Sequence, residues 1–430
     1  RNCINLASIS IPNSVLSIGD RCYYLCKDLT TLDIGSGLTN IGDAAFAYCN
    51  LSVVTINENT NFSFSNNTLY DVINNAIISC NSSNENFVVP DNITKIKDYA
   101  FYGNENISSI SLNNVTEIGA YAFGKCTSLE NFVNAGNVNR AKRNSFYNTP
   151  WLDNSNIRLI GKTLVKYDDE DNNVYVVPSN ISTIGDDAFN SFELEKIILN
   201  ESIEYIGENG LAACANLNDI YFLRTIPCVI FNNSIINKST MNIYVPQIGL
   251  DRYRSDTKFS KYYNSIKTKS VTLKLYDGQV IIDSKTVLFG SIINNIRQQN
   301  KTGYSFSGWK NENTNEIYNT GSYLNIYDDQ INLYAHYIPN EYIIYLNNEG
   351  IFLNDELIRY GAVASLPVPY KNGYDFIGWF DGPSDSYNRI TTNDGLLINN
   401  WSYDHDSVLY AVYTPKEYNI TYVLNNGISP

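Results

Sequence analysis

The sequence predicts an α/β solenoid of short stacked repeats, followed by tandem small β-rich modules. One phrase recurs through the first half of the chain: aliphatic-Gly-Asp, then Ala-Phe-x-x-Cys, then Leu-x-x-aliphatic-x-aliphatic. Four of the six steps between its successive large apolar residues are 22 or 23 residues, counted over Tyr23, Phe46, Phe101, Phe123, Phe146, Phe189 and Leu211. A unit that returns at a fixed period stacks on copies of itself, so the period predicts the solenoid. After about Thr268 the pattern changes to alternating, Tyr-rich segments.

Each repeat is expected to contribute one strand to a parallel sheet on the concave face. In the segment from Leu29 to Ile34, Leu32 and Ile34 point one way, and Thr31 and Asp33 point the other. The first pair builds the core and the second faces solvent.

The Asp-x-Ala-Phe-x-x-Cys part of each repeat predicts a short helix or 3₁₀ turn on the convex face, because Asp before small residues suits a helix start. Two stretches break the period, Asn57 to Phe87 and Trp151 to Tyr175. They hold apolar residues without the recurring phrase, and we interpret them as one or more degenerate coils.

The full motif Ile-Gly-Asp-x-Ala-Phe-x-x-Cys-x-x-Leu-x-x-Ile-x-Ile-Pro closely resembles the BspA-like leucine-rich repeats of bacterial surface proteins. It is legible from Ile18 to Cys26, Ile41 to Cys49, Ile118 to Cys126 and Ile184 to Phe192. The resemblance implies an α/β leucine-rich-repeat solenoid over residues 1–268, with a closing cap at about 223–268 that covers the last coil. Since the chain opens inside a repeat without an initiator Met, we expect it to be a fragment.

The second half repeats a different signature. The segment Gly303-Tyr-Ser-Phe-Ser-Gly-Trp309 returns 70 residues later as Gly373-Tyr-Asp-Phe-Ile-Gly-Trp379. This resembles the Listeria-Bacteroides repeat, also called the internalin B-type repeat, which implies small β-grasp-like modules. We predict modules at 269–338 and 339–415 and the start of a truncated third at 416–430. Trp309 and Trp379 are expected in the module cores, and Trp401 is the better candidate for an exposed ring.

Composition limits the partners. A net charge of −14 and a pI of about 4.6 argue against nucleic acid or an anionic membrane surface. No run of about 18 or more apolar residues occurs, so no transmembrane segment is predicted. We expect a monomeric protein that is extracellular or at the cell surface.

The positions of the cysteines predict that most of them pack in the core as free thiols. Cys26, Cys49, Cys126 and Cys214 share one repeat position whose other occupants include Phe192. We therefore expect buried free thiols, whereas Cys3, Cys80 and Cys228 have no place in this pattern.

Catalytic and metal sites find little support, and no cofactor is predicted. The only histidines, His336 and His405, lie in the β-modules, which disfavours a zinc site and a Ser-His-Asp or Cys-His arrangement. The acidic run from Asp168 to Asp171 is expected to be a solvated loop, with a loose calcium site as the alternative.

We therefore predict a non-enzymatic protein whose concave solenoid face binds a macromolecule, a protein or glycan on a host or bacterial surface, with the β-modules as stalk. The solvent row of that face is polar early and aromatic late, which favours the late coils because Tyr and Ile are typical of interface centres. The candidate ligand-binding residues are Lys196, Ile198, Asp219, Tyr221, Asn242 and Tyr244. The family resemblance implies adhesion. Two alternatives stay open, a structural spacer or surface-layer component without a ligand, and the targeting region of a larger extracellular enzyme.

Overall fold

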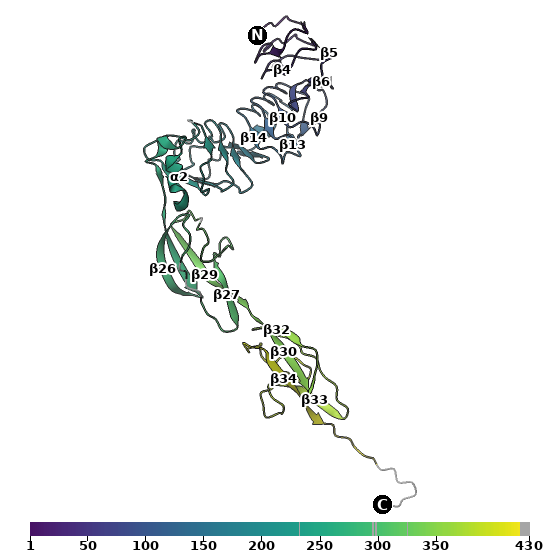
Figure 1. Cartoon of the computed structure of the whole chain (residues 1–430), viewed down its shortest axis with the longest axis vertical. Helices are drawn as coiled ribbons and strands as arrows, with labels where there is room; N and C mark the ends of the chain where they lie inside the picture. Colours follow the sequence, from purple (N-terminus) through teal and green to yellow (C-terminus); the bar gives the residue numbers. More distant parts are fainter. Residues whose placement is uncertain (232, 295, 297–298, 325, 422–430) are drawn as a thin grey trace, which may run out of the picture. The chain divides into compact units, whose positions relative to one another are not determined.

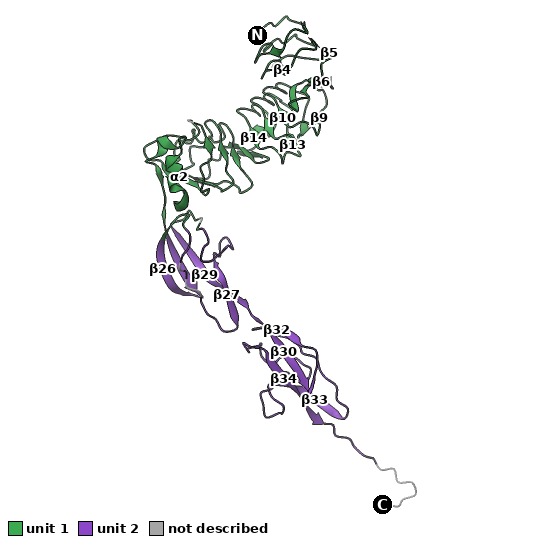
Figure 2. Cartoon of the chain, viewed as in Figure 1, with its two compact units in different colours: residues 1–271, 287–291, 324–328 green, residues 272–286, 292–323, 329–430 purple. Residues whose placement is uncertain are grey.

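The computed structural model describes residues 1–231, 233–294, 296, 299–324 and 326–421. The chain divides into two compact units (Figure 2). Unit 1 comprises Arg1–Val271 with the short segments Val287–Ser291 and Leu324–Asp328. Unit 2 comprises Thr272–Thr286, Ile292–Tyr323 and Asp329–Pro430. Most of the predicted third module, 422–430, lies outside the described residues.

Unit 1 is a β-solenoid with one parallel strand per coil on one face, as the alternation predicts (Figure 1). Neighbouring coils pair in register, so that Thr31 lies beside Val53 and Asp33 beside Thr55. We call this the strand face. It consists of three separate sheets: β1 (Ser8–Ile11), β3 (Thr31–Ile34) and β5 (Val53–Ile56); β9 (Asn86–Val88), β11 (Ser109–Ser111) and β13 (Asn131–Val133); and β17 (Val174–Val176), β19 (Lys196–Leu199), β21 (Asp219–Phe222), β23 (Asn242–Tyr244) and β24 (Ile266–Lys267).

A second set of two-residue parallel strands carries the Ile of the Ile-Gly-Asp phrase and its equivalents. These strands are β2 (Ser17–Ile18), β4 (Asn40–Ile41), β10 (Lys95–Ile96), β12 (Glu117–Ile118), β14 (Arg140–Ala141), β18 (Thr183–Ile184), β20 (Tyr205–Ile206) and β22 (Val229–Ile230). The Ala-Phe-x-x-Cys segments that follow most of them form hydrogen-bonded turns, and the predicted convex helices are not found there.

The turns replace helices because their N–H groups bond to the next coil. In one coil Tyr99 and Gly103 have positive φ angles of 62° and 73°. The alternate N–H groups of Tyr99, Phe101 and Gly103 donate to carbonyls of the following coil at 2.9, 2.7 and 2.8 Å. In an α-helix these N–H groups would instead bond to carbonyls of the same segment. The inter-coil bonds offset the cost of left-handed backbone at non-glycine positions.

Helices are short and few in the described chain. α1 (Pro150–Asp153) follows the fifth recurring phrase, with the Thr149 hydroxyl accepting from the Leu152 N–H at 3.2 Å. The last coils are closed by η1 (Gln247–Gly249), α2 (Leu250–Ser255) and η2 (Ser260–Tyr262). Tyr253 of α2, Tyr262 of η2 and Phe259, which precedes η2, are buried against the last coils and cover the apolar end of the stack.

The two irregular stretches are degenerate coils that also contain antiparallel insertions, which the sequence interpretation did not include. The first contains β6 (Phe62–Ser65), β7 (Thr68–Asp71) and β8 (Ala76–Cys80), and the second contains β15 (Ile157–Ile160) and β16 (Thr163–Tyr167). Each insertion joins the sheet of two-residue strands, through β8–β10 and β16–β18. The strand face is therefore interrupted twice, and β5 and β9 become edge strands at the first interruption.

The Gly-Asp pair of the phrase ties one coil to the next. The Asp20 carboxylate accepts from the N–H of Asp43 in the following coil at 2.9 Å, and Asp98 and Asp186 make the equivalent bond at 2.8 Å each. A Cβ on Gly42 would lie 2.3 Å from the Asp20 oxygen. Glycine is needed because the two coils approach this closely.

The repeated cysteines are buried free thiols, as predicted. Cys126 Sγ donates to the carbonyl of Phe101 in the preceding coil at 3.1 Å, and Cys49 makes the equivalent contact at 3.2 Å. Burial raises the pKa of both thiols to about 12. Cys80 and Cys228 are also buried, whereas Cys3 and Cys22 are exposed.

The two β-modules share one arrangement, a parallel pair flanked by an antiparallel strand. The first has β25 (Ser270–Asp277), β26 (Val280–Leu288), β27 (Tyr304–Lys310), β28 (Ile317–Tyr318) and β29 (Gln330–Pro339) in the order β26-β25-β29-β27-β28. The second has β30 (Glu341–Asn348), β31 (Ile351–Phe352), β32 (Glu356–Arg359), β33 (Tyr374–Phe380) and β34 (Ser407–Pro415) in the order β31-β30-β34-β33, with β32 also on β30. Trp309 and Trp379 are buried as predicted. The prediction for Trp401 is wrong, since its ring is 2% exposed and packs on Tyr403.

Candidate functional site

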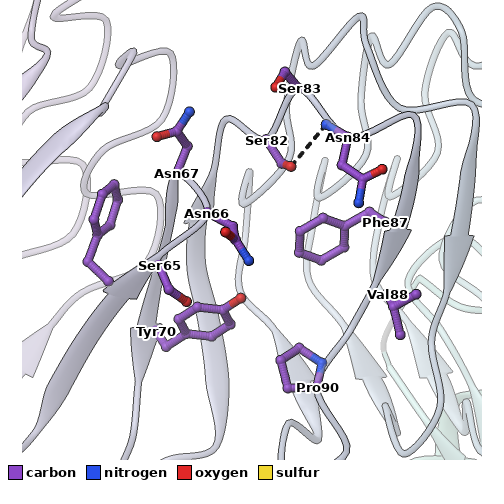
Figure 3. Close-up of a pocket in the computed structure, with 11 residues that line it drawn as sticks. Ser65, Asn66, Asn67, Tyr70, Ser82, Ser83, Asn84, Phe87, Val88 and Pro90 are labelled. Atoms are coloured by element: carbon purple, nitrogen blue, oxygen red, sulfur yellow. Dashed lines mark hydrogen bonds between the residues drawn. The ribbon is translucent and has the colours of Figure 1, made fainter.

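A cleft of about 680 Å³ lies in unit 1 where the strand face is interrupted between β5 and β9 (Figure 3). One wall is the β6–β7 hairpin, which contributes Phe64, Ser65, Asn66, Asn67 and Tyr70. The other wall runs from the segment before β9 through β9 to Pro90, and contributes Ser82, Ser83, Asn84, Phe87, Val88 and Pro90. We call this the hairpin cleft.

The hairpin tip is shaped by its two asparagines. Asn66 and Asn67 connect β6 to β7 with φ angles of 50° and 54°. Two successive left-handed residues make a type I′ turn, in which Asn is favoured because its short side chain tolerates that backbone. The turn therefore places two amide side chains at the mouth of the cleft.

On the opposite wall, side-chain hydrogen bonds fix the backbone of the segment that precedes β9. The Asn84 N–H donates to Ser82 Oγ at 3.1 Å (Figure 3). Asn84 Oδ1 accepts from the Asn86 N–H at 3.2 Å. Phe87 is buried and meets Phe101 edge to face at 5.4 Å. Val88, the next residue along β9, is 61% exposed and faces the cleft.

The lining is uncharged. Its eleven residues comprise three aromatic rings, six Ser or Asn side chains, Val88 and Pro90. Burial raises the pKa of Tyr70, opposed by hydrogen bonds from Thr68 and Ser65, so its phenol is neutral at physiological pH. The cleft thus combines apolar ring surface with donors and acceptors that carry no net charge.

The late coils of the strand face, where binding residues were predicted, differ from the expectation. Lys196, Asp219 and Asn242 lie side by side in register and are half-buried, with Asn242 Nδ2 donating to Asp219 Oδ1 at 2.7 Å. Ile198 and Tyr221 are only 0% and 1% exposed. The prediction that these two side chains face solvent is wrong.

Tyr221 is covered by other segments of unit 1. Its ring stacks on Tyr244 at 4.6 Å and lies 6.0 Å from Phe289 and 6.2 Å from Tyr327. Lys269 Nζ donates to the Tyr221 hydroxyl at 2.9 Å and to the Tyr327 carbonyl at 3.0 Å. Burial raises the pKa of Tyr221, and the bond from Lys269 opposes the rise. The aromatic row predicted as a contact patch is thus largely an internal contact, with Tyr244 half-exposed at its margin.

One Ser–His pair occurs in the first β-module. Ser307 Oγ lies 2.6 Å from His336 Nδ1. In the described chain no carboxylate hydrogen-bonds to this imidazole, and the second module has Ile377 and Val412 at the equivalent places in its strand pair. The pair is therefore not a feature of the repeated module.

Neither a metal-binding cluster nor a membrane-spanning helix occurs among the residues that the structure describes. They contain no group of three or more His, Cys, Asp or Glu side chains that could hold a metal ion. The acidic run near Asp169 is a local turn, in which Asp169 accepts from the N–H of Asp171 and from the amide of Asn172. None of the described helices is long and apolar enough to cross a membrane.

Comparison with protein families gives two matches. The BspA type leucine-rich repeat region matches in six copies over residues 1–84, 59–167 and 171–260. The chain belongs to the BspA-type leucine-rich repeat family. The Listeria-Bacteroides repeat domain matches residues 270–336 and 342–412, so the BspA-type solenoid is followed by two such domains. Both are non-catalytic repeat domains, and BspA-like proteins are cell-surface proteins.

Individual relatives are distant. A putative Gly-rich membrane protein of Evansella cellulosilytica is 26% identical over 208 residues, which cover 46% of this chain and 21% of the relative. This BspA-type chain thus spans about a fifth of that protein's length. Among solved structures, the pneumococcal vaccine antigen PcpA is 14% identical with a TM-score of 0.31, over 60% of this chain and 65% of PcpA. A leucine-rich cell surface protein of Faecalibacterium prausnitzii is 21% identical with a TM-score of 0.33, over 55% and 64%.

Proposed function

We propose that this chain is part of a non-enzymatic bacterial cell-surface or secreted protein that binds a macromolecular ligand through the strand face of its solenoid. Residues 1–268 supply the binding surface, and the modules at 269–338 and 339–415 serve as a stalk. The family is one of surface proteins, and the Evansella relative is called a membrane protein. The charge of −14 disfavours nucleic acid as the ligand, and we propose a monomer.

The hairpin cleft is the observation that carries this proposal. The regular coils give a strand face without a described cleft of this kind, whereas the interruption between β5 and β9 creates a concavity with exposed Val88 and a neutral polar lining. Ligand sites are typically concave, with about 300–1,000 Å³ of space. The cleft therefore supports recognition better than the covered aromatic row at the late coils. Lys196, Asp219, Asn242 and Tyr244 remain a second proposed contact because they stay half-exposed.

A pair of matched variants tests the location. Val88 and Val133 both face solvent at the same register position of one sheet, with Ser111 between them. The full chain is screened for saturable binding to host matrix proteins, bacterial surface proteins and glycans. We expect Val88→Lys to weaken binding at least about tenfold, since a lysine would place a charge and extra bulk in the cleft, and Val133→Lys to leave it within about twofold.

Other outcomes have definite meanings. Equal effects of the two variants, or none, would move the site away from the hairpin cleft. An absence of saturable binding to every probe would favour a spacer or surface-layer role. The third alternative, the targeting region of a larger enzyme, predicts a catalytic domain in the flanking sequence of the full-length protein.

A further inference from the structure

We propose that the hairpin cleft binds a neutral oligosaccharide. This inference rests on the proposed function and adds the chemical class of the ligand. It follows from three features of the cleft, namely its ring surfaces, its amide and hydroxyl groups, and its lack of charge.

The ring surfaces suit the apolar faces of sugar rings. Phe64 on β6, Tyr70 on β7 and Phe87 on β9 are among the lining residues. Phe64 is half-buried, and Tyr70 and Phe87 are 8% and 5% exposed, so the cleft reaches only the margins of the last two rings. A pyranose presents C–H groups on its faces and hydroxyls around its edge. Aromatic side chains offer rigid apolar area, and their negative π faces attract C–H groups. A sugar ring lying between the hairpin and β9 would meet the exposed side chain of Val88 and the accessible margins of these rings.

The polar groups suit the hydroxyl edges. Asn66, Asn67 and Asn84 each carry two N–H donors and a carbonyl acceptor, and Ser65 and Ser83 each carry a hydroxyl. A sugar hydroxyl both donates and accepts, so groups with mixed capacity satisfy it. Ser65, Asn66, Ser83 and Asn84 are exposed, so their side chains can reorient toward a ligand without losing buried hydrogen bonds.

The lack of charge selects against acidic and basic ligands. None of the lining residues is Asp, Glu, Lys, Arg or His. The depression beside the second hairpin provides a contrast, since it measures about 200 Å³ and is lined by Lys142, Lys166, Asp168, Asp186 and Asp187 among others. Insertion of a hairpin into this solenoid thus does not by itself produce a neutral aromatic cleft. A buried charged group without a partner would be costly in such a lining.

An extended peptide is the main competitor, because an edge strand can accept another strand. β9 is an edge strand of only three residues, Asn86–Val88, and the Asn86 N–H is already bonded to Asn84 Oδ1. A three-residue edge with one of its donors already bonded offers little main-chain pairing. The observations therefore favour the saccharide.

The test is calorimetric titration of the full chain with hexasaccharides of matched length. The neutral probes are cellohexaose, maltohexaose and mannohexaose. Hexagalacturonate is the acidic probe, hexaglucosamine the basic one, and a nine-residue Val/Thr/Tyr-rich peptide represents the competitor. We expect saturable binding of at least one neutral hexasaccharide, unchanged between low and high salt because no charge pair contributes.

Variants then assign the binding to the cleft. We expect Val88→Lys to weaken the neutral hexasaccharide at least about tenfold and Val133→Lys to change it less than about twofold. Asn66→Gly keeps the left-handed turn and removes one amide, and Asn84→Ala removes another, so each should weaken binding by about two- to tenfold. Circular dichroism of each variant confirms that it is folded.

Two results would overturn the inference. One is the absence of saturable binding to all three neutral probes at millimolar concentration. The other is binding of only the charged probes or the peptide. If a protein ligand from the broader screen still loses affinity with Val88→Lys, the proposed function stands and only the saccharide is rejected. If no ligand responds to Val88→Lys, the cleft itself is rejected.

Discussion

Replacing Tyr221 tests whether its ring stabilises the fold or contacts a ligand. The ring is 1% exposed, stacks on Tyr244 at 4.6 Å and lies near Phe289 and Tyr327. Truncating a buried aromatic ring to Ala typically costs about 3–5 kcal/mol of unfolding free energy. Lys269 would also lose its 2.9 Å hydroxyl partner. We expect Tyr221→Ala to destabilise unit 1 by about 3–5 kcal/mol, a large fraction of the roughly 5–15 kcal/mol typical of a domain.

The control is Tyr221→Phe, which keeps the ring and removes only the hydroxyl, at an expected cost of about 1–2 kcal/mol. Urea unfolding followed by circular dichroism measures the total, and hydrogen–deuterium exchange of peptides spanning 219–244 locates the effect. We expect faster exchange there in Tyr221→Ala and unchanged ligand binding at the hairpin cleft. Unaltered unfolding and exchange combined with lost binding would refute this reasoning, because the ring would then face a ligand as the sequence row predicts.

Three further predictions concern other parts of the chain. Burial raises the pKa of the Asp186 carboxyl in the folded protein. A raised folded-state pKa contributes stability that is fully present below the unfolded pKa of about 3.9 and is lost as the pH rises through the folded-state pKa. Because Asp186→Asn keeps an oxygen acceptor but does not titrate, the unfolding free energy of this variant in urea should change less between pH 4 and 7 than that of the wild type. Only the exposed Cys3 and Cys22 of the eight thiols should react with Ellman's reagent at pH 8 in the folded protein, and reaction of four or more would contradict the buried row. Gly308 and Gly378 have φ angles of +142° and +147°, and an added Cβ would lie 2.4 Å from Ile317 Cγ2 and 2.5 Å from the Thr391 carbonyl oxygen, respectively. Either Gly→Ala variant should therefore lower the thermal unfolding temperature of its module, by the equivalent of more than about 1 kcal/mol of stability. An unchanged unfolding temperature would contradict this conformational strain.

The solenoid could be predicted from sequence because its information is periodic. Leu32 and Ile34 are buried while Thr31 and Asp33 are half-exposed, as the alternation requires. The same periodicity identified the thiol position, although the alignment was one residue off in one coil: Phe192 is 60% exposed, and the buried Ser191 makes the equivalent bond to the preceding coil. The short helix that was one of the two forms expected for the convex segments is not found, because local propensity does not reveal that the N–H groups of a turn bond to the next coil, 21 or 22 residues away.

The hairpin cleft was missed although its sequence carries a signal. Phe62-Ser-Phe-Ser65 alternates strictly, Asn66 and Asn67 follow, and Thr68-Leu-Tyr-Asp71 resumes as a strand. Two Asn residues between two strand-like segments are typical of a two-residue hairpin turn. The expectation of an uninterrupted period led to a different interpretation. The burial of Tyr221 could not be found this way, because Phe289 and Tyr327, which cover it, lie 68 and 106 residues further along the chain.

Recognition by a repeat protein depends on where the repetition is broken. Coils that pair in register present the same strand position at every step, so a uniform row distinguishes ligands poorly unless its side chains vary. Two hairpins break this chain's period, and they leave depressions of opposite character, one neutral and aromatic, the other lined by Lys and Asp. Between them the three coils from β9 to β13 hold a fixed register. The rigid coils therefore fix the position of the β9 wall of the cleft, and Val88→Lys against Val133→Lys compares a site at the break with its equivalent within the regular repeat.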